Sequence, residues 1–172
     1  MNYNIELLNI NDYDKVYVIM EQSFPCIEYR VYNEQYRLMS LSNYKIYVIK
    51  HDSDIIGFIS IWLLSKYVFV EHFAINELYR GKGIGENLLR YIKDKYSYII
   101  LEVELPHDIN SKRRINFYNK HGFKYNDYEY SQPPLRVDYP YLDLAIMSYP
   151  ASLSNNEFKS IVDELYKIVY KI

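Results

Sequence analysis

The stretch Tyr79-Arg-Gly-Lys-Gly-Ile-Gly85 holds three of the five glycines in the chain. An apolar stripe typical of a helix follows at once, with Ile84, Leu88, Leu89 and Ile92 on one face. A helix N-terminus leaves backbone N–H groups unpaired and carries the positive end of the helix dipole, so it binds phosphate groups. Glycine lets the backbone approach such a ligand without a Cβ in the way. The stretch therefore predicts a phosphate-binding loop.

The glycine spacing distinguishes between possible phosphate carriers. A Walker loop requires four residues between its first glycine and Gly-Lys-Ser/Thr, and this stretch has neither that spacing nor the hydroxyl. A dinucleotide fingerprint has the form G-x-G-x-x-G, but counting from Gly81 and Gly83 places Glu86 at the third glycine. A carboxylate there would repel a pyrophosphate. The spacing therefore disfavours both nucleotide-binding interpretations.

The bulk properties narrow the class further. A length of 172 residues without repeats or long linkers predicts one domain spanning residues 1–172. A net charge of −2 favours neither nucleic acid nor an anionic membrane as a partner. The longest apolar run, Ile55–Leu64, is far shorter than a membrane span. The single cysteine, Cys26, excludes an internal disulfide and a multi-cysteine zinc site, so we expect no metal. The N-terminal residues lack a signal pattern, which favours a cytoplasmic protein.

Hydrophobic periodicity predicts the elements that must position the glycine loop. Helices are expected at residues 12–24, 28–41, 110–121, about 154–171 and directly after the loop. Strands are expected at residues 3–8, 44–50, 55–64, 67–75, 98–105, 123–130 and 141–148. Gly122 is expected to be a left-handed helix cap, and Ser154 to Glu157 reads as a capping box. These elements predict a mixed α/β (α+β) protein.

Residues 67–105 form a unit of strand, glycine turn, helix and strand. Such a crossover is right-handed and its two strands are parallel, with the ligand beyond their carboxyl ends. The apolar stripe of the C-terminal helix most simply packs on the protein's own sheet. Because it could also contact a second copy, monomer and homodimer both stay open.

Two separate motifs resemble the GCN5-related N-acetyltransferase (GNAT) family. The family's acetyl-CoA pyrophosphate loop has the form Gln/Arg-x-x-Gly-x-Gly/Ala, which Arg80, Gly83 and Gly85 match. The run from Arg113 to Phe123 resembles the family's second helix, which typically ends in Phe/Leu-Tyr-x-x-x-Gly-Phe. The resemblance covers roughly residues 68–123. It implies the GNAT fold, a mostly antiparallel central sheet with a parallel β-α-β cofactor unit and flanking helices, here with an extra C-terminal helix.

The resemblance implies acetyl transfer from acetyl-CoA, as co-substrate, to a primary amine. A lysine ε-amine, with a pKa of about 10.4, costs roughly 4 to 5 kcal/mol to deprotonate at pH 7. An α-amine near pKa 8 costs only about 1 to 1.5 kcal/mol. The candidate bases are Glu71, Glu102 and Glu104, and a resemblance to the ribosomal-protein alanine acetyltransferase branch favours Glu102. Family members commonly place a tyrosine where Tyr118 lies, which implies that Tyr118 protonates the departing thiolate.

The resemblance also implies the cofactor contacts. Backbone N–H groups near the bulged end of the cofactor strand are expected to stabilise the oxyanion, and the glycine loop to hold the pyrophosphate. Arg113 and Arg114, near the start of the next helix, are expected to reach the 3′-phosphate. At the next helix start Asn110 and Ser111 are both open as the family's cofactor contact. The implied cofactor-binding residues are Phe73, Ala74, Ile75, Arg80, Gly81, Lys82, Gly83, Ile84, Gly85, Asn110 and Arg113.

The acceptor remains open at this stage. Its recognition is expected from Phe24-Pro25 with the first two helices and from the loop at residues 132–140. The amine could belong to a protein N-terminus, a lysine, a polyamine, an amino acid or an antibiotic. An alternative of a different class is a catalytically idle acyl-CoA-binding module that acts as a sensor or partner protein.

Overall fold

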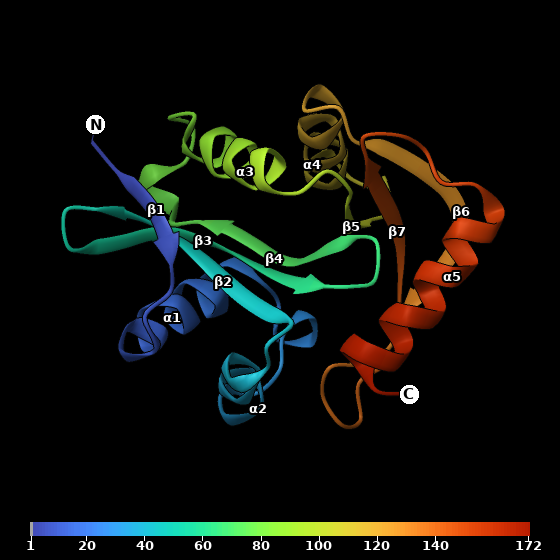
Figure 1. Ribbon diagram of the computed structural model, residues 1–172, viewed down its shortest axis with the longest axis horizontal. Helices are drawn as coiled ribbons and strands as arrows, with labels where there is room; N and C mark the ends of the chain where they lie inside the picture. Colours follow the sequence, from blue (N-terminus) through green and yellow to red (C-terminus); the bar gives the residue numbers. More distant parts are fainter. Residues whose placement is uncertain (1) are drawn as a thin grey trace. The chain divides into compact units, whose positions relative to one another are not determined.

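The computed structural model describes residues 2–172 and divides the chain into two compact units (Figure 1). The first unit comprises residues 1–63 and 70–96, and the second comprises residues 64–69 and 97–172. The strand that enters the glycine loop begins in the second unit and continues in the first.

The first unit contains β1 (Asn4–Leu7), β2 (Tyr44–His51), β3 (Asp54–Leu63) and most of β4 (Val68–Ile75), in the order β1-β2-β3-β4. β1 pairs with β2 and β2 with β3, both antiparallel. The predicted hairpin between β2 and β3 is confirmed, and its turn places Asp52 in a left-handed conformation with φ of 53°. β3 is buried along most of its length, as expected for a strand covered on both faces.

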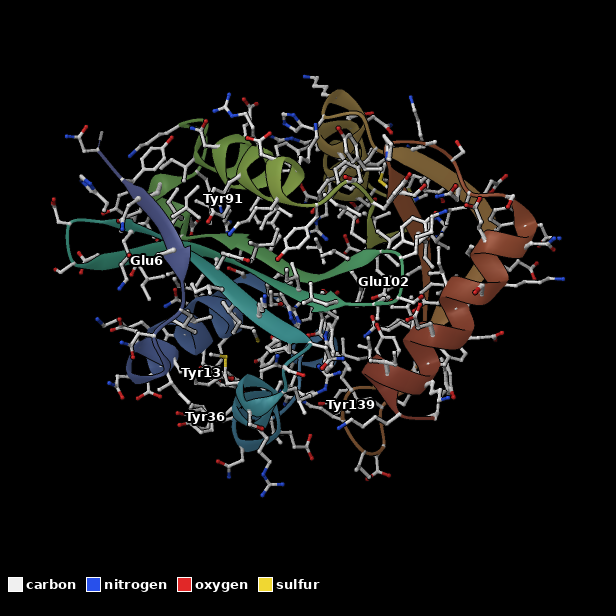
Figure 2. The ribbon with its side chains drawn as sticks, in the orientation of Figure 1. Glu6, Tyr13, Tyr36, Tyr91, Glu102 and Tyr139 are labelled. Atoms are coloured by element: carbon white, nitrogen blue, oxygen red, sulfur yellow. The ribbon has the colours of Figure 1, made fainter. Side chains whose placement is uncertain are left out.

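Helices cover both faces of this sheet. α1 (Tyr13–Ser23) and α2 (Tyr32–Arg37) lie on one face, and α3 (Ile84–Lys95) lies on the other (Figure 1). Tyr13 of α1 and Tyr36 of α2 pack edge to face, with ring centroids 5.1 Å apart (Figure 2). This aromatic contact joins the two helices on their side of the sheet.

The prediction of one continuous helix over residues 28–41 is wrong. A short 3-10 turn spans Cys26–Glu28, the chain is extended at Tyr29 and Val31, and the α-helix begins only at Tyr32. The extended segment contains Arg30, whose carbonyl accepts a hydrogen bond from the Tyr17 hydroxyl at 3.2 Å. These tertiary contacts outweigh the local preference for helix.

The second unit contains β5 (Ile99–Glu104), α4 (Ile109–Lys120), β6 (Lys124–Gln132) and β7 (Leu142–Tyr149). The strand order is β5-β7-β6, and both pairings are antiparallel. Within this unit Val68, the first residue of β4, donates its N–H to the carbonyl of Tyr98, just before β5, at 2.9 Å. The starts of β4 and β5 therefore lie side by side, as the predicted parallel crossover requires.

The predicted C-terminal helix is confirmed as α5 (Asn155–Leu165), continued by a π-helical turn at Tyr166–Tyr170. The capping box between Ser154 and Glu157 is present. The Phe158 ring stacks on Tyr128 of β6 at 4.5 Å, and the side chains of Ile161, Leu165 and Val169 are buried. The apolar stripe therefore packs within its own unit.

The mixed α/β class with mostly antiparallel strands is confirmed. No helix among residues 2–172 combines the length and apolar character needed to cross a membrane.

Candidate active site

The glycine loop has the backbone geometry that its sequence predicts. It follows β4 and a 3-10 turn at Glu77–Tyr79, and it ends at Gly83, the N-cap of α3. Gly81 and Gly83 have φ angles of 73° and 74°, in the left-handed region that L side chains rarely adopt. A Cβ built at either position would meet no atom within 4 Å. The glycines are therefore required for backbone conformation, and the space in front of the loop is open.

The start of α3 presents backbone donors beside two cations. The first intrahelical bond of α3 runs from the Asn87 N–H to the Gly83 carbonyl, so the first-turn N–H groups have no acceptor inside the helix. Arg80 Nε donates to the Ile75 carbonyl at 2.9 Å, and Lys82 Nζ donates to the Leu78 carbonyl at 3.0 Å. Both side chains are thereby held at the loop. The N–H groups, the helix dipole and the two charges fit a pyrophosphate.

β4 contains one residue more than β3 opposite it. At the hairpin the Leu64 N–H donates to the Tyr67 carbonyl, and a regular ladder from there would place Ile56 opposite Ile75. Instead the Asn76 N–H donates to the Ile56 carbonyl at 2.9 Å. An extra residue in one strand of an antiparallel pair is a β-bulge. The strand before the loop therefore contains a bulge.

Side-chain directions locate the bulge at Glu71 and His72. Adjacent side chains of a regular strand point to opposite faces. Glu71 and His72 instead reach the same segment before α2, where Glu71 pairs with Arg30 and His72 Nε2 donates to the Glu28 carbonyl at 2.9 Å. The His72 N–H also leaves the strand ladder, because it donates to the Ser60 hydroxyl at 3.1 Å. The residues after the bulge, Phe73 to Ile75, are those expected to face the oxyanion.

Gly57 on β3 allows the close approach of β4 beyond the bulge. A Cβ at Gly57 would lie 2.8 Å from the Ala74 carbonyl oxygen and 2.5 Å from Ile75 Cδ1. A Cβ at Gly85, in contrast, would meet its nearest neighbour, Phe73 Cζ, at an ordinary 3.5 Å. Only Gly57 is therefore excluded by space from carrying a side chain.

Replacing Gly57 with Ala is expected to lower the free energy of unfolding by about 1 to 3 kcal/mol, because the backbone of β4 must move. Gly85→Ala is the matched control, and it is expected to be neutral or stabilising because Gly85 lies within a helix. Urea unfolding of both variants checks this pair of predictions. Equal stabilities of Gly57→Ala and the wild type would contradict the packing argument.

Glu71 lies in a buried polar cluster of the first unit. Its Oε1 accepts from Arg30 Nη1 at 2.6 Å, while its Oε2 has no hydrogen-bond partner among residues 2–172. Burial raises the pKa of Glu71, but the charge and hydrogen bond of the Arg30 guanidinium outweigh this effect, so the pKa lies below the usual range. Glu71 is therefore an ionised carboxylate at neutral pH, and one of its buried oxygens has no hydrogen-bond partner in the described chain.

Tyr118 lies on α4 in the second unit. Its side chain is buried, and no residue of the described chain forms a hydrogen bond with its hydroxyl. Burial raises the pKa of Tyr118 to about 12, although the charge of Arg114 partly opposes this. The phenol is therefore protonated at neutral pH and available as a hydrogen-bond donor. Gly122, with φ of 89°, ends the same helix in the predicted left-handed conformation.

The two glutamates of β5 are both engaged within the second unit. Glu102 (Figure 2) accepts hydrogen bonds from the hydroxyls of Tyr130 and Tyr170, and the Tyr170 oxygen lies 2.7 and 2.9 Å from the two carboxylate oxygens. Glu104 forms an exposed ion pair with Arg114 at 2.7 Å. The contacts of Glu102 join β5, β6 and the C-terminal π-helical turn. They favour a structural role for the glutamate that the sequence ranked first as the base.

The N-terminal cap of α4 distinguishes between Asn110 and Ser111, the two candidates for a cofactor contact. Asp108 is the N-cap, and Ser111 completes a capping box with it. Ser111 is buried and its hydroxyl is used in the cap, whereas Asn110 and Arg113 are exposed. Asn110 is therefore the better candidate of the two.

Comparisons with known proteins agree with this geometry. The family model for the acetyltransferase (GNAT) domain matches residues 42–125. A GNAT-family protein from Bacteroides thetaiotaomicron is 30% identical, and the alignment covers 98% of this chain and 99% of that one, with a TM-score of 0.91. The chain belongs to the GNAT acetyltransferase family. The GNAT fold predicted from the two motifs is thereby confirmed.

Two further similarities are more limited. The structure of yncA from Salmonella typhimurium, solved with its cofactor acetyl-CoA, has a TM-score of 0.64 at 16% identity and covers 90% of this chain and 97% of that one. The curated protein YjbC of Bacillus subtilis (strain 168) is 33% identical over 61 residues, which are 34% of this chain. That match spans about a third, 32%, of YjbC.

Each of the two compact units of this GNAT chain contains some of the predicted site residues. The first unit contains the bulge, Glu71 and the glycine loop, and the second contains Tyr118, Asn110, Arg113 and the β5 glutamates. Sequence reasoning missed Arg30, Gly57, Tyr130 and Tyr170. Only Gly57 carried a signal, since an isolated glycine in an apolar strand marks a bulge or a close backbone approach.

Removing the Tyr170 hydroxyl tests the structural role of Glu102. Tyr170→Phe is expected to lower the free energy of unfolding by about 1.5 to 3 kcal/mol, the range for hydrogen bonds to charged groups. The turnover rate is expected to change less than twofold. Thermal unfolding and steady-state kinetics on one preparation measure both quantities. A large change in kcat at unchanged stability would instead assign Glu102 to the reaction.

Proposed function

We propose that residues 1–172 form one N-acetyltransferase domain that transfers an acetyl group from acetyl-CoA to a primary amine. The observation that carries this proposal is the left-handed Gly81–Gly83 turn at the start of α3, flanked by the held cations of Arg80 and Lys82. The acetyl-CoA complex of yncA supports the identity of the phosphate carrier at the level of the fold. The membership in the GNAT family supports acetyl transfer.

We assign each polar part of acetyl-CoA to a different group of residues. The N–H groups at the start of α3, with Gly81 to Gly85, hold the pyrophosphate oxygens. Arg113 on the exposed face of α4 takes the 3′-phosphate, and Asn110 lies one turn before it. The N–H groups of the bulged strand, Phe73 to Ile75, stabilise the oxyanion that forms when the amine attacks the thioester carbonyl.

We propose Glu71 as the proton acceptor. Among the three candidate glutamates it is the one with a buried carboxylate oxygen that lacks a hydrogen-bond partner in the described chain. Its lowered pKa makes it a weak base. A weak base suits an amine whose deprotonation at pH 7 costs little free energy, which favours α-amines near pKa 8 over lysine ε-amines near pKa 10.4.

Tyr118 is proposed to stabilise the departing thiolate. An alkyl thiol has a pKa of about 8.5, and complete proton transfer from a phenol of pKa about 12 would cost roughly 5 kcal/mol. A hydrogen bond from the phenol to sulfur carries no such cost and strengthens as negative charge develops on the sulfur. Tyr118 therefore acts as a donor to sulfur before the thiolate takes its proton.

The test is acetyl-CoA-dependent thiol release across a panel of α-amino peptides, lysine ε-amines, polyamines and amino acids, with buffer as the blank. The exposed thiol of Cys26 adds at most one background thiol per chain, so repeated turnover is distinguishable. We expect release with an α-amine class before any ε-amine. If no amine of the panel gave thiol release while acetyl-CoA still bound, the alternative of a catalytically idle acyl-CoA-binding module would be favoured.

A further inference from the structure

Arg30 is fixed by contacts on three sides. It lies in the extended segment before α2, with 8% of its surface exposed. Its carbonyl accepts from the Tyr17 hydroxyl, its guanidinium pairs with Glu71 at 2.6 Å, and its Cζ lies 6.0 Å from the centroid of the Trp62 ring. An arginine with so little exposure is held in one geometry by its partners.

The segment that carries Arg30 holds both residues of the β4 bulge. Arg30 contacts Glu71, and two residues earlier the Glu28 carbonyl accepts from His72 Nε2. Since a carbonyl only accepts, the His72 proton is on Nε2, and Nδ1 accepts from the Ser60 hydroxyl at 3.3 Å. Burial lowers the pKa of His72, so the ring is neutral. Arg30 is thus the cation that balances the buried charge of Glu71.

Among the residues that the structure describes, no other cation in the cluster replaces Arg30. The groups around Glu71 are Arg30, His72 on the same strand, and the tyrosines Tyr13 of α1 and Tyr44 of β2. Burial raises the pKa of both tyrosines, so they are neutral. Without the guanidinium, the desolvation of Glu71, which is the largest single influence on its pKa, would prevail.

We propose that Arg30 is a positioning residue for acetyl transfer, which holds Glu71 ionised and the β4 bulge in shape. This inference rests on the proposed function, because its kinetic consequence requires that Glu71 accepts the proton. Its electrostatic part concerns the free protein and is measurable without turnover.

The first experiment titrates Glu71 itself. Carbon-13 NMR of the glutamate carboxyl groups follows titration, with the Glu71 signal assigned by its loss in Glu71→Gln. In the wild type this signal is expected to titrate below the usual glutamate range, and in Arg30→Met above it. Arg30→Lys keeps a charge but not the planar guanidinium, and is expected to fall between them. A Glu71 titration that is the same in all three proteins would overturn the proposal.

The second experiment is the pH profile of kcat/KM with an amine from the thiol-release panel. In Arg30→Met the acidic limb is expected to move to higher pH and kcat to fall at least tenfold, while the Kd for acetyl-CoA stays within twofold. The control is Lys50→Met, which removes another ion-paired cation of the first unit, bound to Glu6 and Asp12. Its profile is expected to match the wild type.

The two experiments distinguish a failure of the proposed acetyl transfer from a failure of the proposed role of Arg30. A shifted Glu71 titration without turnover of the wild type would overturn the proposed function and the kinetic role of Arg30, and leave the electrostatic part standing. Turnover with unchanged profiles in Arg30→Met and Arg30→Lys would overturn the Arg30 proposal alone. Should Arg30→Met fail to fold, Arg30→Lys provides the same two readouts.

Discussion

Tyr118→Phe is expected to lower kcat tenfold or more and to leave the Kd for acetyl-CoA nearly unchanged. Loss of a hydrogen bond to a developing thiolate raises the barrier of the step in which the thiolate leaves, and each 1.4 kcal/mol is about tenfold in rate. The hydroxyl has no hydrogen-bond partner in the described chain, so its removal breaks no contact of the free protein there. The fold is therefore expected to be unaffected.

Steady-state kinetics and equilibrium binding of acetyl-CoA measure the two quantities separately. Because the pKa of Tyr118 is about 12, the phenol stays protonated through the neutral range, and the ratio of wild-type to variant kcat is expected to be constant from pH 6 to about pH 9. Equal kcat values for the two proteins would remove Tyr118 from the mechanism. A loss that appears only in the Kd would reassign it to cofactor binding.

Gly83→Ala is expected to weaken acetyl-CoA binding at least tenfold. Gly83 has φ of 74° at the N-cap of α3, and an L residue in that conformation costs about 1 to 2 kcal/mol. The loop would relax to another conformation and turn its N–H groups away from the pyrophosphate. Isothermal titration of acetyl-CoA measures the change.

Gly122→Ala is the matched control for this prediction. Its φ of 89° is also left-handed, so it carries similar backbone strain, but it lies at the end of α4 beside Tyr149. Both variants are expected to lose stability, and only Gly83→Ala to lose affinity. If both variants bound acetyl-CoA as the wild type does, the glycine loop would not be the pyrophosphate site.

The features that the sequence predicts correctly are local. The glycine turn, the left-handed Gly122 after α4, the capping box of α5 and the β2–β3 hairpin each depend on residues within a few positions of one another. Their geometry follows from backbone preferences of glycine and from capping side chains. Of these features, the glycine turn carries candidate cofactor contacts.

The features that the sequence misses depend on distant partners. Arg30 and Glu71 are 41 positions apart, and Glu102 and Tyr170 are 68 positions apart. No local pattern links such residues, and with 22 tyrosines in the chain no single one is conspicuous. The same contacts account for the error in the second predicted helix, because Arg30 reaches Glu71 from an extended segment.

The most direct test of acetyl transfer follows the acetyl group itself. The protein is incubated with the best amine of the panel and with acetyl-CoA that carries carbon-13 in the acetyl group. The products are then separated, identified and quantified by mass spectrometry. The account predicts labelled N-acetyl product in a one-to-one ratio with free CoA, and at least tenfold less of both with Tyr118→Phe. Free CoA without labelled amine, or bound acetyl-CoA that stays intact, would contradict it.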